Sequence, residues 1–220
     1  MADQKHLAFL KQGVMAWNRW RNENKEKIHS IDLSSANLQE ANLIEVNLSD
    51  VNLSSANLNY ADLECSDLRF ADLSGADLKF ADLNNADLRF ANLRGADLSG
   101  ADIYGADFHG ADLKFADLSG SDLSGSRRNE IKIDIKWRLV LELVNEGGVN
   151  RNLSGADLSD ANLNHANLSR ADLSNANLSG TNLSHADLSH ADLSHGVHPS
   201  LVSLNLRTCL ESPFSQGLQV

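Results

Sequence analysis

The chain has few of the residues that build an ordinary globular core. Only 5% of its 220 residues are aromatic, and it contains two prolines and two cysteines, Cys65 and Cys209. Two cysteines exclude a disulfide framework. No apolar run reaches the roughly twenty residues of a membrane-spanning helix, and the N-terminus lacks the apolar segment of a signal peptide. We therefore expect a reduced, cytoplasmic protein with an unusual core.

Basic residues are also scarce. The chain has 19 Lys and Arg against 30 Asp and Glu, for a formal net charge of −11. The acidity is concentrated in residues 31–125, where 17 acidic and 5 basic residues leave a net charge of −12. Such a surface repels phosphate groups, so we expect neither direct nucleic-acid binding nor binding to an anionic membrane.

The dominant feature of the sequence is a strict five-residue period. Every fifth residue from Leu33 to Leu123 is apolar, and the same register returns from Leu153 to Leu193. The surrounding pattern is Ala-(Asp/Asn)-Leu-Ser-X, as in residues 71–75. Neither a helix nor a strand keeps every fifth residue on one face, whereas a chain that turns a corner every five residues does. Four corners then close a coil of twenty residues, with Leu and Ala inward, Asp and Asn outward, and coils about 4.8 Å apart.

The fifth position of the repeat forms the corner. Glycine there, as at Gly75, suits a type II turn, which requires a positive φ. Other residues hold this position elsewhere, and at those corners the sequence predicts a different turn type: Ser35, Phe70, Phe80, Phe90 and His185.

This repeat resembles the pentapeptide-repeat family over residues 31–125 and 151–195. The resemblance implies an all-β fold, the right-handed quadrilateral β-helix. Family functions are varied, and they include dimeric DNA mimics that bind gyrase and regulators of signalling or transcription factors. The interruption at 126–150 is similar to helical inserts of cyanobacterial-type members.

The breaks in the register predict five segments. They are an N-terminal helical cap (1–30), a first repeat block (31–125), a helical insertion (126–150), a second repeat block (151–195) and a C-terminal tail or cap (196–220). Apolar residues at helical spacing predict a helix over 4–25, which either caps the first coil or lies on a membrane surface. The stripe consists of Leu7, Leu10, Val14 and Trp17, with Asp3 as the candidate cap.

The insertion contains a second helical pattern. Ile135, Leu139 and Leu143 are four residues apart, and Gly147-Gly148 is a stop signal for the helix. This helix either packs on the tube as a structural insert or docks a partner. The tail from Gly196 either caps the last coil or forms a contact of a homodimer.

Residues twenty apart should be neighbours in the stack, which pairs Phe70 with Phe90 and Tyr60 with Phe80. Exposed aromatic residues beside cations are typical of binding hot spots, whereas the alternative is stacking that only stabilises the tube. The candidate partner-binding residues are Tyr60, Arg69, Phe70, Lys79, Phe80, Arg89, Phe90 and Arg94.

The outward carboxylates should form ladders along the tube. One carboxylate per ~1.3 Å of axis would approach the density of phosphates in DNA, about one per 1.7 Å. The ladders therefore favour, as an alternative function, a DNA mimic that modulates a type II topoisomerase. Close like charges should also raise some carboxylate pKa values. The ladder residues are Asp62, Asp67, Asp77, Asp82, Asp87, Asp97, Asp102, Asp107, Asp117 and Asp122.

No residues indicate catalysis, a cofactor or a metal centre. The chain has no glycine-rich phosphate loop, HExxH or CxxC motif, and its Ser, His and Asp are periodic. His165 and His185 should stack across adjacent coils, and His190, His195 and His198 follow; we interpret all five as exposed corner residues rather than metal ligands. The sequence predicts a non-enzymatic scaffold that presents flat faces to a protein partner.

Overall fold

The computed structural model describes residues 2–24, 31–121 and 134–197. The chain divides into two compact units, Met1–Ile135 and Lys136–Val220, and each is described by itself. Among the described residues, no helix has the length and apolar character needed to cross a membrane.

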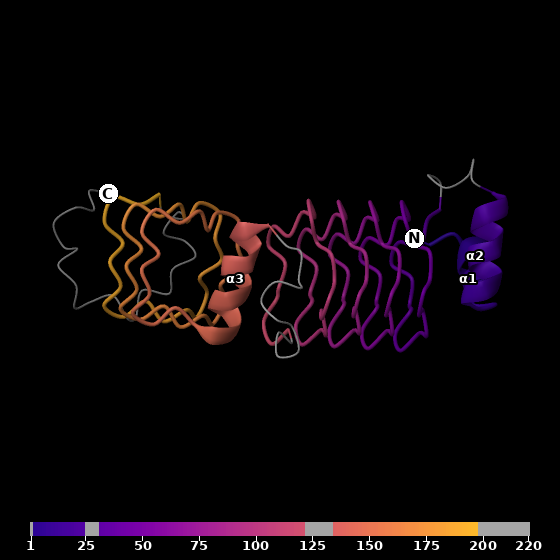
Figure 1. The fold of residues 1–220 in the computed structure, drawn as a ribbon, viewed down its shortest axis with the longest axis horizontal. Coiled ribbons are helices and arrows are strands. Elements are labelled where there is room, and N and C mark those ends of the chain that lie inside the picture. Colours follow the sequence, from indigo (N-terminus) through magenta and orange to yellow (C-terminus); the bar gives the residue numbers. More distant parts are fainter. Residues whose placement is uncertain (1, 25–30, 122–133, 198–220) are drawn as a thin grey trace. The chain divides into compact units, whose positions relative to one another are not determined.

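The first unit is a stack of twenty-residue coils (Figure 1). Residues twenty apart form parallel bridges, from Asp32 with Asn52 to Asp97 with Asp117. Each bridge is a single residue at the second position of a pentapeptide, so the described part of the unit has bridges rather than longer strands. The predicted stacking of residues twenty apart is confirmed.

Each backbone N–H of the repeat at residues 81–85 has a partner. In residues 81–85, the N–H of Ala81 donates to a carbonyl across the corner, and that of Asp82 donates to a carbonyl of the previous coil. The N–H groups of Leu83 and Asn85 donate to carbonyls of the next coil, and all four bonds are 2.8–3.1 Å long. The remaining N–H, that of Asn84, donates to Oδ1 of Asp82 at 2.9 Å. A buried N–H without a partner is costly. Asp or Asn at the second position is therefore required by the fold itself.

Leu and Ala point inward, as predicted. Leu83 and Ala81 are fully buried, as are the residues that stack on Leu83 in the neighbouring coils, Leu63 and Ile103. Burial of one such leucine side chain stabilises the tube by about 1.5–3 kcal/mol. The core is thus a column of aliphatic side chains, repeated at each coil.

The corners correct the prediction of several turn types. Gly75 has a φ of 63°, and the non-glycine corners fall in the same region: Ser35 56°, Phe70 59°, Phe80 54°, Phe90 62° and His185 60°. The prediction of a different turn at these five positions is wrong, because hydrogen bonds to the next coil and across the corner fix the backbone whatever the side chain. A non-glycine residue in this conformation costs about 1–2 kcal/mol.

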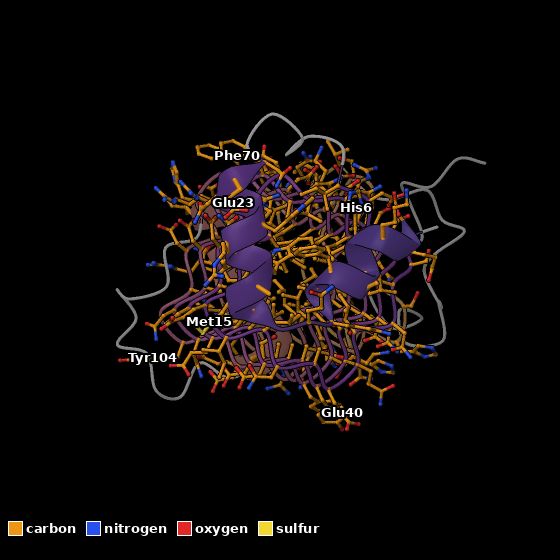
Figure 2. The ribbon with its side chains drawn as sticks, turned by 90° about the vertical axis from the view of Figure 1, so that its right-hand side faces the viewer. His6, Met15, Glu23, Glu40, Phe70 and Tyr104 are labelled. Atoms are coloured by element: carbon orange, nitrogen blue, oxygen red, sulfur yellow. The ribbon has the colours of Figure 1, made fainter. Side chains whose placement is uncertain are left out.

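Two helices, α1 (Gln4–Leu10) and α2 (Val14–Glu23), lie across the first coil (Figure 2). Asp3 caps α1 by accepting a hydrogen bond from the N–H of Lys5 at 2.7 Å. The single predicted stripe is divided between the two helices, because the chain breaks at Gly13 with a φ of 108°. Trp17 is fully buried, and its Nε1 donates to the carbonyl of Asn47 at 2.7 Å.

The contacts of Arg21 favour the cap over a membrane-surface helix. Its side chain is buried, and Nη2 donates to the carbonyl of Ser49 at 2.6 Å and to Oδ1 of Asn47 at 3.0 Å. Burial lowers the pKa of Arg21, while Asp50 and Asp67 oppose that shift. A membrane-binding face would instead need this cation at the surface.

The second unit contains all of α3 (Ile135–Glu146) except its first residue, and it continues as coils. Its bridges extend from Asn152 with Asp172 to Asn177 with Val197. Val197 thus stays in register, although the repeat pattern ends before it. Ile135 is 88% exposed, so its predicted place in the apolar stripe is wrong; the buried residues of α3 are Trp137, Val140, Leu141 and Leu143.

Gly148 marks the junction between α3 and the coils. It occupies an inward leucine position, and its N–H already bonds the next coil at the carbonyl of Asn167, 2.7 Å away. A Cβ here would lie 2.7 Å from Leu168 and 2.9 Å from Leu143. Leu143 of α3 therefore fills the space that a leucine at this position would occupy.

Candidate protein-binding corners

The eight predicted binding residues lie on three corners of the first unit. Residues ten apart are two corners apart on a coil of four corners, so Phe70 and Phe80 belong to opposite edges of the tube. Figure 2 shows this separation for Phe70 and Glu40, which stands in the row of Tyr60 and Phe80. We name the corners after Phe70 (Arg69, Phe70, Arg89, Phe90), Tyr60 (Tyr60, Lys79, Phe80) and Phe115 (Arg94, Phe115).

The Phe70 corner carries a stacked pair of phenylalanines. The rings of Phe70 and Phe90 are 5.2 Å apart and inclined by 10°, and the two residues are 56% and 50% exposed. His109 meets the ring of Phe90 edge-on at 5.9 Å. A Cβ on Gly110 would lie 2.6 Å from Phe90, so the ring of Phe90 covers this glycine of the next coil.

The arginines of this corner are held by the acidic ladder. Nε and Nη2 of Arg69 donate to the two carboxylate oxygens of Asp67 at 2.8 and 2.7 Å. Arg89 binds Asp87 in the same way, at 2.8 and 2.6 Å. Arg69 also lies 3.6 Å from Asp87 in the next coil. Both guanidinium groups are therefore fixed in place beside the exposed rings.

The other two corners are similar in kind but less developed. Tyr60 and Phe80 stack at 5.0 Å and are half exposed, and Lys79 pairs with Asp97 at 2.9 Å. The Arg94 guanidinium lies 5.0 Å from the centre of the Phe115 ring, in a cation–π contact. Each of these corners has a single cation among the predicted residues, whereas the Phe70 corner has two.

Neither His109 nor the supporting glycines are among the predicted site residues. The signal was present, because adding twenty to Arg89 and Phe90 gives His109 and Gly110, the neighbours that the structure shows. The same rule connects Phe80 with Gly100, where a Cβ would lie 2.5 Å from the ring. Glycine at these positions leaves room for the last ring of each stack.

The acidic residues stack as predicted. Bridges connect Asp62, Asp82 and Asp102, then Asp67, Asp87 and Asp107, and then Asp77, Asp97 and Asp117. Asp122 lies outside the described residues.

Several carboxylates have pKa values opposite to the prediction. The pKa of Asp87 is lowered, chiefly by hydrogen bonds from the Arg89 side chain. Burial of Asp97 works in the other direction, but hydrogen bonds from Ser99 and Lys79 outweigh it and lower the pKa. The expectation of raised values is wrong for these groups, because N–H donors and cations stabilise the charged form more than neighbouring carboxylates destabilise it.

The three ladders differ in their counterions. Arg69 and Arg89 accompany the Asp67 ladder, and Lys79 accompanies Asp97. Within residues 31–121, no ion pair involves the ladder of Asp62, Asp82 and Asp102. One ladder of the tube is therefore purely acidic.

Acid should destabilise the fold through these carboxylates. A carboxylate whose pKa is lower in the folded state than the ordinary value of about 3.9 stabilises the fold. This contribution is complete at a pH above the ordinary value, and it is lost as the pH falls through the folded-state pKa. We expect the melting temperature to be flat from pH 7 to about 5 and to fall below pH 4, with a smaller fall in Asp87→Asn. A melting temperature that rises between pH 5 and 3 would contradict the lowered pKa values.

The histidine and cysteine residues of the described chain show no metal cluster. His165 and His185 stack as predicted, and His190 and His195 are exposed corner residues, whereas His198 lies outside the described residues. Among the residues that the structure describes, no group of three or more His, Cys, Asp or Glu could hold a metal ion.

Comparison with known proteins supports the repeat. The family model for pentapeptide repeats matches residues 31–69, 71–110, 88–125 and 152–189, in 8 copies. The solved structure of alr5209, a pentapeptide repeat protein from Nostoc PCC 7120, is 39% identical over 39% of this chain and 83% of that chain, with a TM-score of 0.34. A comparison with curated proteins found no match.

Two further solved structures match over more of the chain. HetL, a pentapeptide repeat protein involved in heterocyst differentiation regulation from Nostoc sp. strain PCC 7120, is 28% identical over 84% of this chain and 92% of that chain, with a TM-score of 0.33. Rfr23 from the cyanobacterium Cyanothece 51142 is 22% identical over 84% and 99%, with a TM-score of 0.37.

Proposed function

Because the chain belongs to the pentapeptide-repeat family, we propose that it is a non-enzymatic scaffold that binds a protein partner through its Phe70 corner. The proposal includes a right-handed quadrilateral β-helix, as the family implies, and a cytoplasmic location, since two cysteines suit a reducing compartment. The observation that carries it is the half-exposed stack of Phe70 and Phe90 between arginines that are already fixed.

Stability alone does not account for these phenylalanines. Stacking of the pair contributes about 0.5–1.5 kcal/mol beyond area burial. The positive φ of the two residues costs about 1–2 kcal/mol each. Glycine fills the same position at many corners without that cost. Two large apolar residues that leave half their surface in water therefore favour a binding role over a purely structural one.

The Phe70 corner is favoured over the Tyr60 corner because of its arginines. Arginine and aromatic residues are enriched at the energetic centres of protein interfaces. Binding usually costs side-chain entropy, and a guanidinium group held by two hydrogen bonds to Asp67 or Asp87 has lost much of it beforehand. The exposed part of Phe70 and Phe90 supplies the apolar contact between these fixed charges.

Replacement of both phenylalanines should weaken partner binding strongly. We expect Phe70→Ser/Phe90→Ser to raise the Kd of the complex about 1000-fold, because each lost hot-spot residue costs about 2 kcal/mol and every 1.4 kcal/mol is tenfold. The partner would be captured with the wild-type chain from soluble extract of the source cell, identified, purified and titrated against each variant by calorimetry.

The matched control is Tyr60→Ser/Phe80→Ser. It removes a stacked aromatic pair of equal exposure from the opposite edge of the tube, so it reproduces any loss of stability. We expect this variant to bind as the wild type does. Equal weakening by both variants, or weakening by the control alone, would refute the assignment to the Phe70 corner.

The acidic ladder supports one alternative to the scaffold function, which is a DNA mimic that modulates a type II topoisomerase. The supporting observation is the ladder of Asp62, Asp82 and Asp102, which no cation accompanies in the described first unit. Mimicry predicts that DNA displaces the partner, that salt weakens binding steeply and that Asp62→Asn/Asp82→Asn/Asp102→Asn reduces it. Capture of a signalling or transcription factor, insensitive to DNA, would instead identify a regulator.

A further inference from the structure

His165 and His185 form an isolated pair on the second unit. They occupy the same corner of consecutive coils, and both are exposed. Their rings are 4.8 Å apart and inclined by only 10°. Imidazole is the commonest protein ligand for transition metals, so two such rings at one surface point are a candidate for chelation.

The backbone holds the two residues together. The N–H of His165 donates to the carbonyl of Ser184 at 3.0 Å, and the bridges Asn162–Asn182 and Asn167–Asp187 lie on either side of the pair. Both histidines have nearly the same φ, 61° and 60°, so their side chains leave the corner in the same direction. The spacing is therefore set before any ligand arrives, and binding need not order the chain.

The ring nitrogens of the pair are available. Among the described residues, no hydrogen bond or ion pair engages the side chain of His165 or His185; their contact is with each other. In the stacked arrangement the nitrogen lone pairs lie in parallel planes and do not converge. Rotation about the Cβ–Cγ bond is soft for histidine, and a turn of both rings directs one nitrogen from each to a common point.

We propose that His165 and His185 bind one divalent transition-metal ion of the class Cu²⁺, Ni²⁺ or Zn²⁺, with water in the remaining positions. Two neutral imidazoles match these ions, whereas Mg²⁺ and Ca²⁺ require oxygen ligands. No third protein ligand is assigned, because the described residues hold no group of three metal-binding side chains. The site is separate from the Phe70 corner, which belongs to the first unit.

The test is calorimetric titration of the untagged full chain at pH 7.5 with Cu²⁺, Zn²⁺ and Mg²⁺ in separate experiments. We expect one equivalent of Cu²⁺ to bind, Zn²⁺ to bind more weakly and Mg²⁺ not to bind. His165→Gln and His185→Gln should each weaken Cu²⁺ binding at least roughly tenfold, because the second ligand then no longer acts at high effective concentration.

His190→Gln/His195→Gln is the matched control, since it removes two exposed histidines of the same unit that lie at successive corners of a coil rather than at the same corner of adjacent coils. It should bind Cu²⁺ as the wild type does. Substitution of His165 or His185 is a surface change, so loss of fold does not confound the result. Unchanged binding in both single variants, equal loss in the control, or no binding to the wild type would overturn the proposal.

Discussion

Leu83→Asp is expected to unfold the first unit. Leu83 is fully buried between Leu63 and Ile103, and the backbone N–H groups of residues 81–85 already donate to other acceptors. The change removes about 1.5–3 kcal/mol of apolar burial and adds the penalty of an unpaired buried charge. A loss of about 5 kcal/mol or more would reach the total stability of many domains.

The measurement is hydrogen exchange followed by mass spectrometry, together with thermal melting. Amides of residues 31–121 should lose protection, whereas those of 148–197 in the second unit should keep it. Asn85→Asp is the matched control, because it adds the same charge two residues later at an exposed corner. Wild-type protection in Leu83→Asp would mean that the third position of the repeat does not face the core.

The five-residue period was sufficient to predict the coil, its inward residues and the neighbours twenty apart. It could not reveal why Asp or Asn follows each alanine, because that reason is one backbone N–H at the fourth position, such as that of Asn84. An outward side chain can hydrogen-bond to water, to a partner or to its own backbone, and the pattern of residue types is the same in each case. The structure shows that here the carboxylate accepts a hydrogen bond from the backbone.

The corners show a second limit of the sequence. Glycine preference predicted the turn at Gly75, and the same preference led to the wrong turn at Phe70 and Phe90. Local propensity amounts to about 1–2 kcal/mol, whereas the coil fixes each corner through several hydrogen bonds. The hydrogen bonds of the coil therefore outweigh local propensity, and the aromatic residues adopt a positive φ that is unfavourable for them in isolation.

The candidate site was predicted in pairs but not as a surface. Counting by twenty gave the stacks of Phe70 with Phe90 and Tyr60 with Phe80. The two stacks are ten residues apart in the sequence and therefore lie on opposite edges of the tube, so the eight residues do not face one partner surface. The bidentate pairing of Arg69 with Asp67 depends on side-chain rotamers, which no spacing rule describes.

The helices show how a non-repeating segment adapts to the repeat. The stripe of residues 4–25 had the correct inward members, Leu10 and Trp17, but Gly13 divides it into α1 and α2. In the second unit Gly148 leaves a leucine position empty, and Leu143 of α3 reaches it from outside the coil. That Leu143 occupies the place of a repeat leucine can be seen only in the three-dimensional structure.

Trp17→Ala should open the first end of the tube. Trp17 is fully buried under α2, and its Nε1 satisfies the carbonyl of Asn47. Truncation of a buried tryptophan costs about 3–5 kcal/mol, and this change also leaves a carbonyl without its donor. Once α2 detaches, the apolar core and bridging edge of the first coil face solvent, which invites end-to-end association.

The expected result is a lower denaturation midpoint together with oligomers that grow with concentration in size-exclusion chromatography with light scattering. Met15→Ala is the matched control, because it truncates an apolar residue of the same helix that is 83% exposed and should change neither property. If Trp17→Ala loses stability but stays at the wild-type mass, the open coil does not attract another chain, and α2 acts only as a stabilising element. If both variants behave as the wild type, α2 is not the cap of the first coil.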